Sequence, residues 1–250
     1  MNAIKDTSLF EKVKHRVVRA LEVLLFSNRY SIYSQQIYSH HLLSFSQEGE
    51  DMILRRLFEN RERGFYVDVG AHHPQRFSNT YFFYLRGWRG INIDAMPGSM
   101  VPFEKLRPED TNIEAAISDF SEELTYYSFN EPALNSFSEP LSKNRDGVNN
   151  YEIVDKRLIK TKRLSEIFDE YLPLGQEITF LSVDVEGLDY QVLLSNDWSK
   201  YKPEIVLVEE LSDSLDTSDK VSRTYCLLKE QGYEIFSRTF NTSFYKLVSA

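Results

Sequence analysis

A glycine and an acid 24 residues apart are the first residues whose types and spacing could serve a chemical function. Gly70, in the run Asp68-Val-Gly-Ala71, ends a short apolar segment, and glycine permits the sharp turn and close backbone approach that a bound nucleotide needs. Asp94 ends the next apolar segment, where a carboxylate can accept hydrogen bonds from both hydroxyls of an adenosine ribose. The pair predicts a nucleotide-type cofactor. The alternative is a plain strand–turn–helix with Asp94 on the surface.

The loop after Gly70 lacks most of the glycines that dinucleotide sites carry. One glycine is present where three are usual, and His72, His73 and Pro74 occupy positions at which backbone amides would have to close on a pyrophosphate. S-adenosylmethionine (SAM) has no phosphate and therefore tolerates such a loop. The loop thus favours SAM over NAD.

Four acids follow two later apolar segments. Asp184 and Glu186 close the first of these segments, and Glu209 and Glu210 close the second. Converging acids suit a hard cation such as Mg²⁺ or Mn²⁺, with Asp184, Glu209 and Glu210 as predicted ligands. Without a metal, paired carboxylates raise one another's pKa and leave a general base, which makes Asp184 and Glu186 predicted catalytic residues. The alternative is that Asp184 binds loop amides and the glutamates cap a helix or face solvent.

Histidine is the other candidate base. All five histidines lie in the first 73 residues, so a histidine base must come from the loop after Gly70 or from the N-terminal part of the chain. His72 is the best placed and is the third predicted catalytic residue; the alternative is a histidine packed in the loop with a backbone partner. The histidines are His15, His40, His41, His72 and His73.

These residues need a scaffold that brings several strand ends together. From about residue 46, short strand-like runs alternate with helical segments, which is typical of an open, mostly parallel α/β sheet with helices on both faces. Ligands bind such sheets beyond the carboxyl ends of the strands, where Gly70, Asp94 and Asp184 fall. We predict strands at 65–69, 90–94, 111–117, 178–185 and 204–209, helices at 78–86, 99–106 and 220–231, and a closing hairpin of 233–238 with 242–248.

Two further segments are expected to contact ligands. Residues 130–160 carry dense turn signals and no clear periodicity, and we predict that they form a substrate lid. Five aromatic residues flank this lid and would either stack on a sugar ring or pack in the protein; they are Tyr126, Tyr127, Phe129, Phe137 and Tyr151. The segment Ser46-Gln-Glu-Gly-Glu-Asp51 opens a helix, and its acids are predicted either to touch a ligand or to form a polar helix start.

Several separated motifs occur together in one order and spacing. They are Ser46-Gln-Glu-Gly-Glu-Asp51, Phe65-Tyr-Val-Asp-Val-Gly-Ala-His-His-Pro74, Ser78-Asn-Thr80, Gly87-Trp-Arg-Gly-Ile-Asn-Ile-Asp94 and Asp184-Val-Glu-Gly187. With these motifs the sequence resembles the FkbM-type methyltransferases over roughly residues 44–248. The resemblance implies a SAM-dependent O-methyltransferase that acts on a hydroxyl of a sugar or glycoconjugate, in polysaccharide, glycolipid or natural-product biosynthesis. It also implies a Rossmann-like class I methyltransferase fold, with a seven-stranded, mostly parallel sheet and a C-terminal antiparallel hairpin.

The same resemblance implies which residues hold the cofactor. The loop after the first strand would line the amino-acid and ribose side of SAM, the start of the next helix would support it, and the adenine would lie near Ile117. His72 and Pro74 depart from the Asn and Gly that many relatives carry at these positions. Asn79 would also suit a plain helix cap. The implied cofactor-binding residues are Asp68, Gly70, Ala71, Asn79, Thr80, Asp94, Ala95, Ala116 and Ser118.

Charge, cysteine content and hydropathy narrow the class of protein further. The 29 basic and 38 acidic residues give a net charge of −9, so no attraction to nucleic acid is expected. The single Cys226 excludes an intrachain disulfide and a cysteine-rich zinc site, and it suits a cytoplasmic protein. No apolar run approaches the about 20 residues needed to span a bilayer, and the start of the chain lacks a signal-peptide profile.

We predict an N-terminal helical extension at residues 1–44 and one methyltransferase domain at residues 45–250. Within the extension, residues 13–26 place apolar side chains at helical spacing beside basic ones. We expect this helix to dock on the domain or on a second subunit of a homodimer; the alternative is peripheral contact with a membrane surface.

Two other functional classes compete with a methyltransferase. An NAD-linked sugar oxidoreductase or epimerase would use a related sheet, but the missing glycines argue against it. A non-catalytic scaffold would keep the fold and pair through its N-terminal helix, but the intact Asp68, Gly70, Asp94 and Asp184 argue against that. The expected partner is a sugar-containing small molecule or a lipid-linked glycan.

Overall fold

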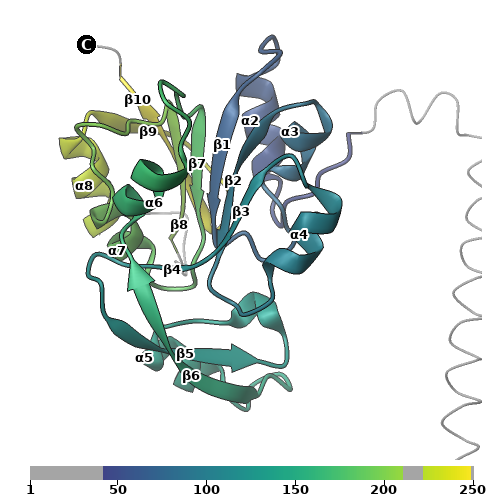
Figure 1. Cartoon of the computed structure of the whole chain (residues 1–250), viewed down its shortest axis with the longest axis vertical. Helices are drawn as coiled ribbons and strands as arrows, with labels where there is room; N and C mark the ends of the chain where they lie inside the picture. Colours follow the sequence, from purple (N-terminus) through teal and green to yellow (C-terminus); the bar gives the residue numbers. More distant parts are fainter. Residues whose placement is uncertain (1–41, 211–221, 249–250) are drawn as a thin grey trace, which may run out of the picture. The chain divides into compact units, whose positions relative to one another are not determined.

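A computed structural model of the protein describes residues 42–210 and 222–248 (Figure 1). Residues 1–41 lie outside the described residues. They include most of the predicted extension at 1–44, the helix predicted at 13–26, and the histidines His15, His40 and His41. The predicted boundary between extension and domain therefore stays a prediction. Among the described residues, no helix has the length and apolar character needed to cross a membrane.

The main sheet has seven strands in the order β3-β2-β1-β7-β8-β10-β9. Neighbouring strands from β3 to β8 are parallel, whereas β10 is antiparallel to both β8 and β9. The predicted mostly parallel sheet with a closing antiparallel hairpin is confirmed. The strands are β1 (Phe65–Val69), β2 (Arg89–Asp94), β3 (Thr111–Glu114), β7 (Phe180–Val183), β8 (Ile205–Glu209), β9 (Tyr233–Arg238) and β10 (Thr242–Leu247).

Helices cover both faces of this sheet (Figure 1). Successive residues of a strand point to opposite sides, so Val67 packs in the core under α6, α7 and α8, whereas Tyr66 packs with side chains of α2 and α3. Burial on both faces explains why β1 reads as an almost continuous apolar run. The helices are α2 (Glu50–Leu57), α3 (Tyr81–Leu85), α4 (Met100–Leu106), α6 (Leu164–Tyr171), α7 (Asp189–Leu194) and α8 (Arg223–Glu230).

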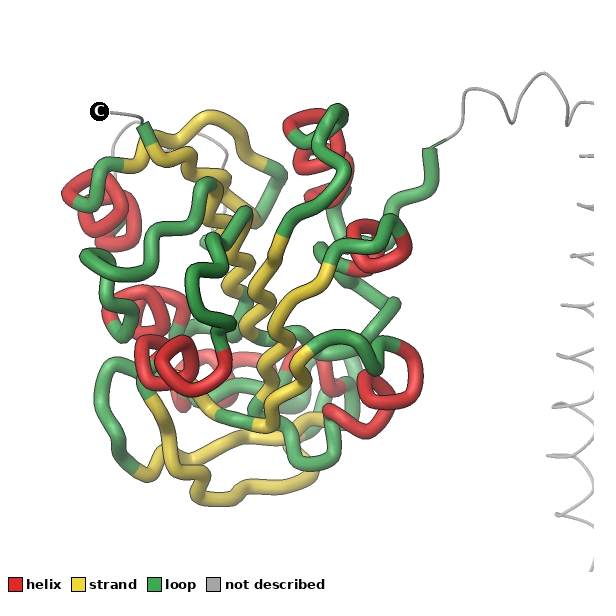
Figure 2. Tube along the Cα trace, turned by 45° about the horizontal axis from the view of Figure 1, so that its top comes forward, coloured by secondary structure: helices red, strands yellow, loops and turns green. Residues whose placement is uncertain are grey.

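A second, three-stranded sheet lies between β3 and α6 in the chain, and we call residues 116–162 the insert. Its strands, in the order β4-β6-β5, are β4 (Ala116–Ile117), β5 (Glu123–Phe129) and β6 (Ile153–Lys162). A short 3-10 helix, η2 (Pro132–Leu134), and α5 (Glu139–Arg145) connect β5 to β6. Figures 1 and 2 show the insert at the lower end of the main sheet.

The structure of the insert corrects one predicted strand. The strand predicted at 111–117 is broken after Ala115, whose backbone N–H still donates to the Asp94 carbonyl at 2.9 Å, because the chain then leaves the main sheet and pairs with β6 as β4. The segment 130–160, which shows no clear periodicity in the sequence, contains η2, α5 and most of β6, and its role as a substrate lid stays a prediction. The sequence of β6 is mostly polar and largely exposed, so it carries no apolar period, and its pairing with β5 is what makes it a strand.

Other differences concern element ends. The helix predicted from residue 78 starts at Tyr81, whose N–H donates to the Ser78 hydroxyl at 3.1 Å. Strand β7 stops at Val183 because the N–H groups of Val185 and Gly187 donate to the Asp189 carboxylate, which forms a tight turn there. The sequence patterns did not predict β5, α6 or α7.

Candidate active site

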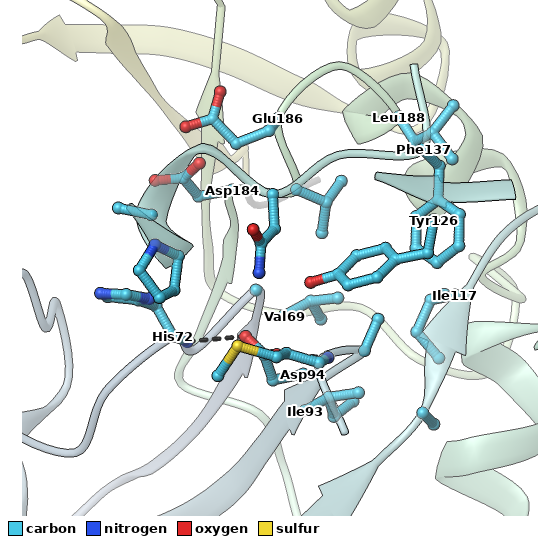
Figure 3. Close-up of a pocket in the computed structure, with 18 of the residues that line it drawn as sticks. Val69, His72, Ile93, Asp94, Ile117, Tyr126, Phe137, Asp184, Glu186 and Leu188 are labelled. Atoms are coloured by element: carbon cyan, nitrogen blue, oxygen red, sulfur yellow. Dashed lines mark hydrogen bonds between the residues drawn. The ribbon is translucent and has the colours of Figure 1, made fainter. Parts of the chain in front are cut away.

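A pocket opens at the carboxyl ends of β1, β2 and β7 (Figure 3). Ligands of parallel α/β sheets bind in this position, where loops diverge from neighbouring strands. The strand-end loops contribute Gly70, Asp94 and Asp184 to its lining, and the insert contributes Tyr126 and Phe137. The sequence-predicted residues His72, Ala95 and Glu186 also line it.

Gly70 is required by the packing of the protein itself. Its φ of 86° lies in the left-handed region, and a Cβ at this position would come within 1.7 Å of the Asp184 carbonyl oxygen. The glycine thus lets the loop after β1 cross directly against the loop after β7. It also leaves only backbone at this part of the pocket wall, which is what a closely approaching ligand needs.

Asp94 is held by the two loops beside it. Its Oδ2 accepts the backbone N–H of His72 and its Oδ1 accepts that of Met96, each at 2.8 Å. Burial raises the pKa of Asp94, and these two hydrogen bonds act in the opposite direction. A carboxylate has about four acceptor sites, so the group keeps lone pairs free for a ligand while its orientation is fixed.

Asp68 and Thr80 lie behind the pocket rather than in its wall. The Thr80 hydroxyl donates to Asp68 at 2.8 Å and accepts from Arg107, whose guanidinium is fully buried and paired with Asp110 at 2.8 Å. Burial raises the pKa of Asp68 to about 6, although Arg107 opposes the shift. Asp68 and Thr80, both predicted to bind the cofactor, therefore stabilise the pocket loops through hydrogen bonds inside the protein.

Two more predicted cofactor residues serve the scaffold. The Asn79 amide donates to the Ser182 hydroxyl on β7 at 3.0 Å, and Ala71 packs in a small core with Met100 and Phe103 of α4. Neither side chain lines the pocket, although the loop that carries them does form its edge.

The predicted adenine wall is corrected in part. Ile117 lines the pocket as predicted, and Ala115 lines it as well, whereas Ala116 and Ser118 are buried and do not. Side chains alternate along an extended chain, so the residues on either side of Ile117 point away from the pocket. The correction leaves an apolar wall of Ile93, Ala115 and Ile117, which suits a flat aromatic base.

Three carboxylates converge beside this pocket. One oxygen each from Asp184, Glu186 and Glu209 lies within 4.8 Å of the other two. Burial, and then the charge of Glu186, raise the pKa of Asp184. Burial, and then the charge of Asp184, raise the pKa of Glu209 to about 11. Such a group can hold a hard cation through its oxygens or share a proton.

Glu210 is not part of this cluster. It accepts from the Ser222 hydroxyl at 2.6 Å and from the Tyr245 hydroxyl at 3.0 Å, on the other side of β8. Neighbouring residues of a strand point in opposite directions, so Glu209 and Glu210 cannot serve one small site together. The structure thus replaces Glu210 by Glu186 in the predicted set of metal ligands.

An arginine of the insert meets the cluster. Arg145, the last residue of α5, pairs with Glu186 at 2.7 Å, and both side chains are largely buried, with 20% and 17% exposed. The Ser136 hydroxyl donates to the Glu186 carbonyl at 2.6 Å. The insert is therefore bound to the loop after β7. Arg145 offsets part of the negative charge of Glu186, whereas no described residue forms an ion pair with Glu209.

His72 lines the pocket with a side chain that has an unpaired nitrogen. Its Nε2 is buried and has no hydrogen-bond partner in the described part of the chain. Burial, and then the charge of Arg76, lower its pKa, so the imidazole is neutral at pH 7. A neutral imidazole facing a pocket is able to accept a proton or a hydrogen bond.

The acids of the segment at residues 46–51 hold the β9–β10 turn. Glu48 accepts from the Asn241 backbone N–H at 2.8 Å and from its amide at 2.7 Å, and Glu50 accepts from the hydroxyl of Thr242. Asp51 accepts from Ser44 and Ser46. None of these three acids lines the pocket, and Glu50 and Asp51 lie in the first turn of α2. Gln47, which the sequence patterns did not single out, lines the pocket instead.

The strand order and this pocket define a Rossmann-like protein of the class I methyltransferase fold. Residues 68–235 match the FkbM methyltransferase domain family, and the chain belongs to that family. It is a SAM-dependent methyltransferase. The alternatives of an NAD-linked enzyme and of a non-catalytic scaffold are thereby set aside.

Comparison with solved structures returns, among others, a TehB-like SAM-dependent methyltransferase from Corynebacterium glutamicum. The alignment covers 89% of this chain and 97% of that one, with 7% sequence identity and a TM-score of 0.38. Comparison with curated proteins gives no significant match.

Proposed function

We propose that the protein transfers the methyl group of SAM to a hydroxyl of a sugar or glycoconjugate. The observation that carries the proposal is the cluster of Asp184, Glu186 and Glu209 at the edge of the cofactor pocket. Methylation of a hydroxyl requires an acceptor for its proton, and a half-buried carboxylate with a raised pKa is a stronger base than an ordinary carboxylate. The sugar acceptor is proposed from the resemblance to enzymes of polysaccharide and glycolipid assembly.

The groups that line the pocket suit the three parts of SAM. Asp94 presents free lone pairs for the ribose, Ile93, Ala115 and Ile117 offer an apolar wall for the base, and Gly70 leaves backbone exposed near the methionine end. When bound, SAM supplies an electrophilic methyl group on a sulfonium.

The residues of the chain then have two tasks. Asp94 and the apolar wall fix the orientation of the cofactor, which lowers the entropic cost of an in-line transfer. Asp184 or Glu186 accepts the proton of the acceptor hydroxyl, and His72, neutral and unpaired, is the alternative base.

We further propose that Mg²⁺ or Mn²⁺ binds Asp184, Glu186 and Glu209. Three oxygen donors within 4.8 Å suit a hard cation, which would orient the acceptor hydroxyl and lower its pKa. Calorimetric titration with each metal, repeated on Glu209→Gln, tests this. Binding that weakens in the variant together with activity lost in chelator supports the site, and full activity in chelator without measurable binding removes it.

Thermal unfolding in the presence of SAM, S-adenosylhomocysteine or NAD tests the cofactor. A ligand that binds only the native state raises the unfolding temperature. At a ligand concentration of about a hundred times Kd, the free energy of unfolding increases by about 2.7 kcal/mol. We expect a shift with SAM and S-adenosylhomocysteine and none with NAD. A shift with NAD alone would refute the proposal.

A panel of acceptors tests the substrate class. Monosaccharides, nucleotide sugars and lipid-linked glycans are incubated with SAM carrying a ¹³C-methyl group, and the product is examined by NMR, which separates O-methyl from N-methyl signals. O-methylated sugar is the expected product. N-methylation, or transfer only to acceptors without a sugar, would contradict the proposed chemistry.

A further inference from the structure

The insert forms part of the cofactor pocket. Tyr126 on β5, together with Asn135 and Phe137 in the connection to α5, lines the same cavity as Asp94 and Ile117 (Figure 3). Tyr126 is buried, with 5% of its surface exposed, and its ring packs against Phe137 with centroids 4.8 Å apart. The insert therefore presents side chains to the same part of the pocket as Asp94 and Ile117.

The Tyr126 hydroxyl has a free proton. The Asn135 side chain lines the same cavity, and its Oδ1 accepts the Phe129 backbone N–H at 2.7 Å. Within residues 42–210 and 222–248 no protein group accepts the proton of the Tyr126 hydroxyl, which Figure 3 shows directed into the pocket.

Asp94 supplies the complementary half of a binding site. Its carboxylate can only accept hydrogen bonds, whereas the Tyr126 hydroxyl, whose proton no described residue accepts, is able to donate one. The two groups are close enough for the charge of Asp94 to raise the pKa of Tyr126, after the larger effect of burial, so the phenol stays protonated. A ligand group that donates to one and accepts from the other is a hydroxyl.

We propose that Tyr126 is a cofactor-binding residue that donates a hydrogen bond to a ribose hydroxyl of SAM, opposite Asp94. The inference rests on the proposed placement of SAM in this pocket. The insert, which the sequence suggests only as a substrate lid, thereby becomes part of the cofactor site.

Two ion pairs hold the insert in this position. Arg145 of α5 pairs with Glu186 after β7, and Glu131 at the start of η2 pairs with Arg76 in the loop after β1, at 3.2 Å through both guanidinium nitrogens. Each pair joins the insert to a different loop of the pocket. Tyr126 is therefore presented from a strand that is anchored on two sides.

Tyr126→Phe tests the contact, with Tyr127→Phe as the matched control. Tyr127 is the next residue on β5, is similarly buried and does not line the pocket. The dissociation constant of S-adenosylhomocysteine is measured by calorimetry for the wild type and both variants. We expect Tyr126→Phe to weaken binding about tenfold, as for one lost hydrogen bond, and Tyr127→Phe to leave it within about twofold.

Deoxy analogues locate the partner of the hydroxyl. The same measurement is made with the 2′-deoxy and 3′-deoxy analogues of S-adenosylhomocysteine, and the effect of Tyr126→Phe should vanish for the analogue that lacks the contacted hydroxyl. Equal weakening for all three ligands, or no weakening by Tyr126→Phe, overturns the inference while the cofactor assignment stands. Failure of the wild type to bind S-adenosylhomocysteine would instead refute the proposed function.

Discussion

Two acidic sites border one pocket, Asp94 and the carboxylate cluster with Glu209, and they differ in the hydrogen-bond donors that stabilise their negative charges. Asp94 is half-buried, and each of its oxygens receives a backbone N–H, so its geometry is set before any ligand arrives. Glu209 is half-buried, has a buried oxygen without a partner in the described residues, and lies beside two other carboxylates. A neutral hydroxyl satisfies the first site, whereas the second needs a cation or a proton. The difference separates the residues that hold the cofactor from those that perform the chemistry.

Replacement of Asp184 by Asn should have the largest effect. Loss of a general base typically costs about 10²- to 10⁴-fold in rate, and we expect kcat to fall by about 10²- to 10³-fold while the affinity for SAM changes little. Initial rates and SAM binding are measured on the same preparation, with Glu230→Gln on α8 as the control. An unchanged kcat would place the proton acceptor elsewhere, with His72 as the next candidate.

Replacement of Asp94 by Ala should act on binding. The change removes the acceptor of two backbone N–H groups and of the ribose, and charged hydrogen bonds contribute about 1.5–3 kcal/mol each, so SAM should bind about 10- to 100-fold more weakly. Calorimetry with SAM and acceptor titrations separate the two sites. A SAM-linked thermal shift that survives the substitution would show that the ribose lies elsewhere.

The two sites should also differ in pH dependence. The pKa of Glu209 is raised to about 11 in the folded state from its ordinary value of 4.5, so folding takes up a proton between these values. The corresponding stability is present below about pH 4.5 and is lost as the pH rises. In chelator, wild-type protein should therefore lose stability between about pH 5 and pH 8, because the folded state keeps a proton that the unfolded state releases.

Glu209→Gln has no such titrating group. Its free energy of unfolding should change less with pH and should exceed that of the wild type at pH 8. Urea unfolding at each pH provides the comparison. Parallel profiles for the two proteins would mean that Glu209 is ionised in the folded state and that the cluster carries its charge without a proton.

The smallest effects concern the ion pairs that fasten the insert. Arg145 and Glu186 are 20% and 17% exposed, whereas Arg76 and Glu131 are 47% and 32% exposed and thus more screened by water. Double-mutant cycles with Arg→Met and Glu→Gln should give a coupling of about 1–2 kcal/mol for the inner pair and below about 1 kcal/mol for the outer pair. Only the outer coupling should disappear in 1 M salt. Equal couplings would show that burial does not separate the two anchors.

The insert shows why part of the fold could not be predicted. The apolar runs of β1, β2 and β8 are buried on both faces, so their composition alone marks them as strands. Strand β6 is polar and largely exposed, and it is a strand because β5 lies beside it. Local composition can reveal a strand that is buried on both faces, but it cannot reveal a strand that forms only because another strand pairs with it.

The sequence by itself determined that Gly70, Asp94 and Asp184 lie at neighbouring strand ends, because parallel strands bring their carboxyl ends to one edge of the sheet. The tertiary structure decided which neighbours join them. Glu186 rather than Glu210 completes the acidic cluster, and Ala115 rather than Ala116 faces the pocket. Adjacent residues of an extended chain point in opposite directions, so the choice depends on where each strand ends and turns. The approach of Tyr126 to Asp94 depends on the pairing of strands far apart in the chain, which no local pattern encodes.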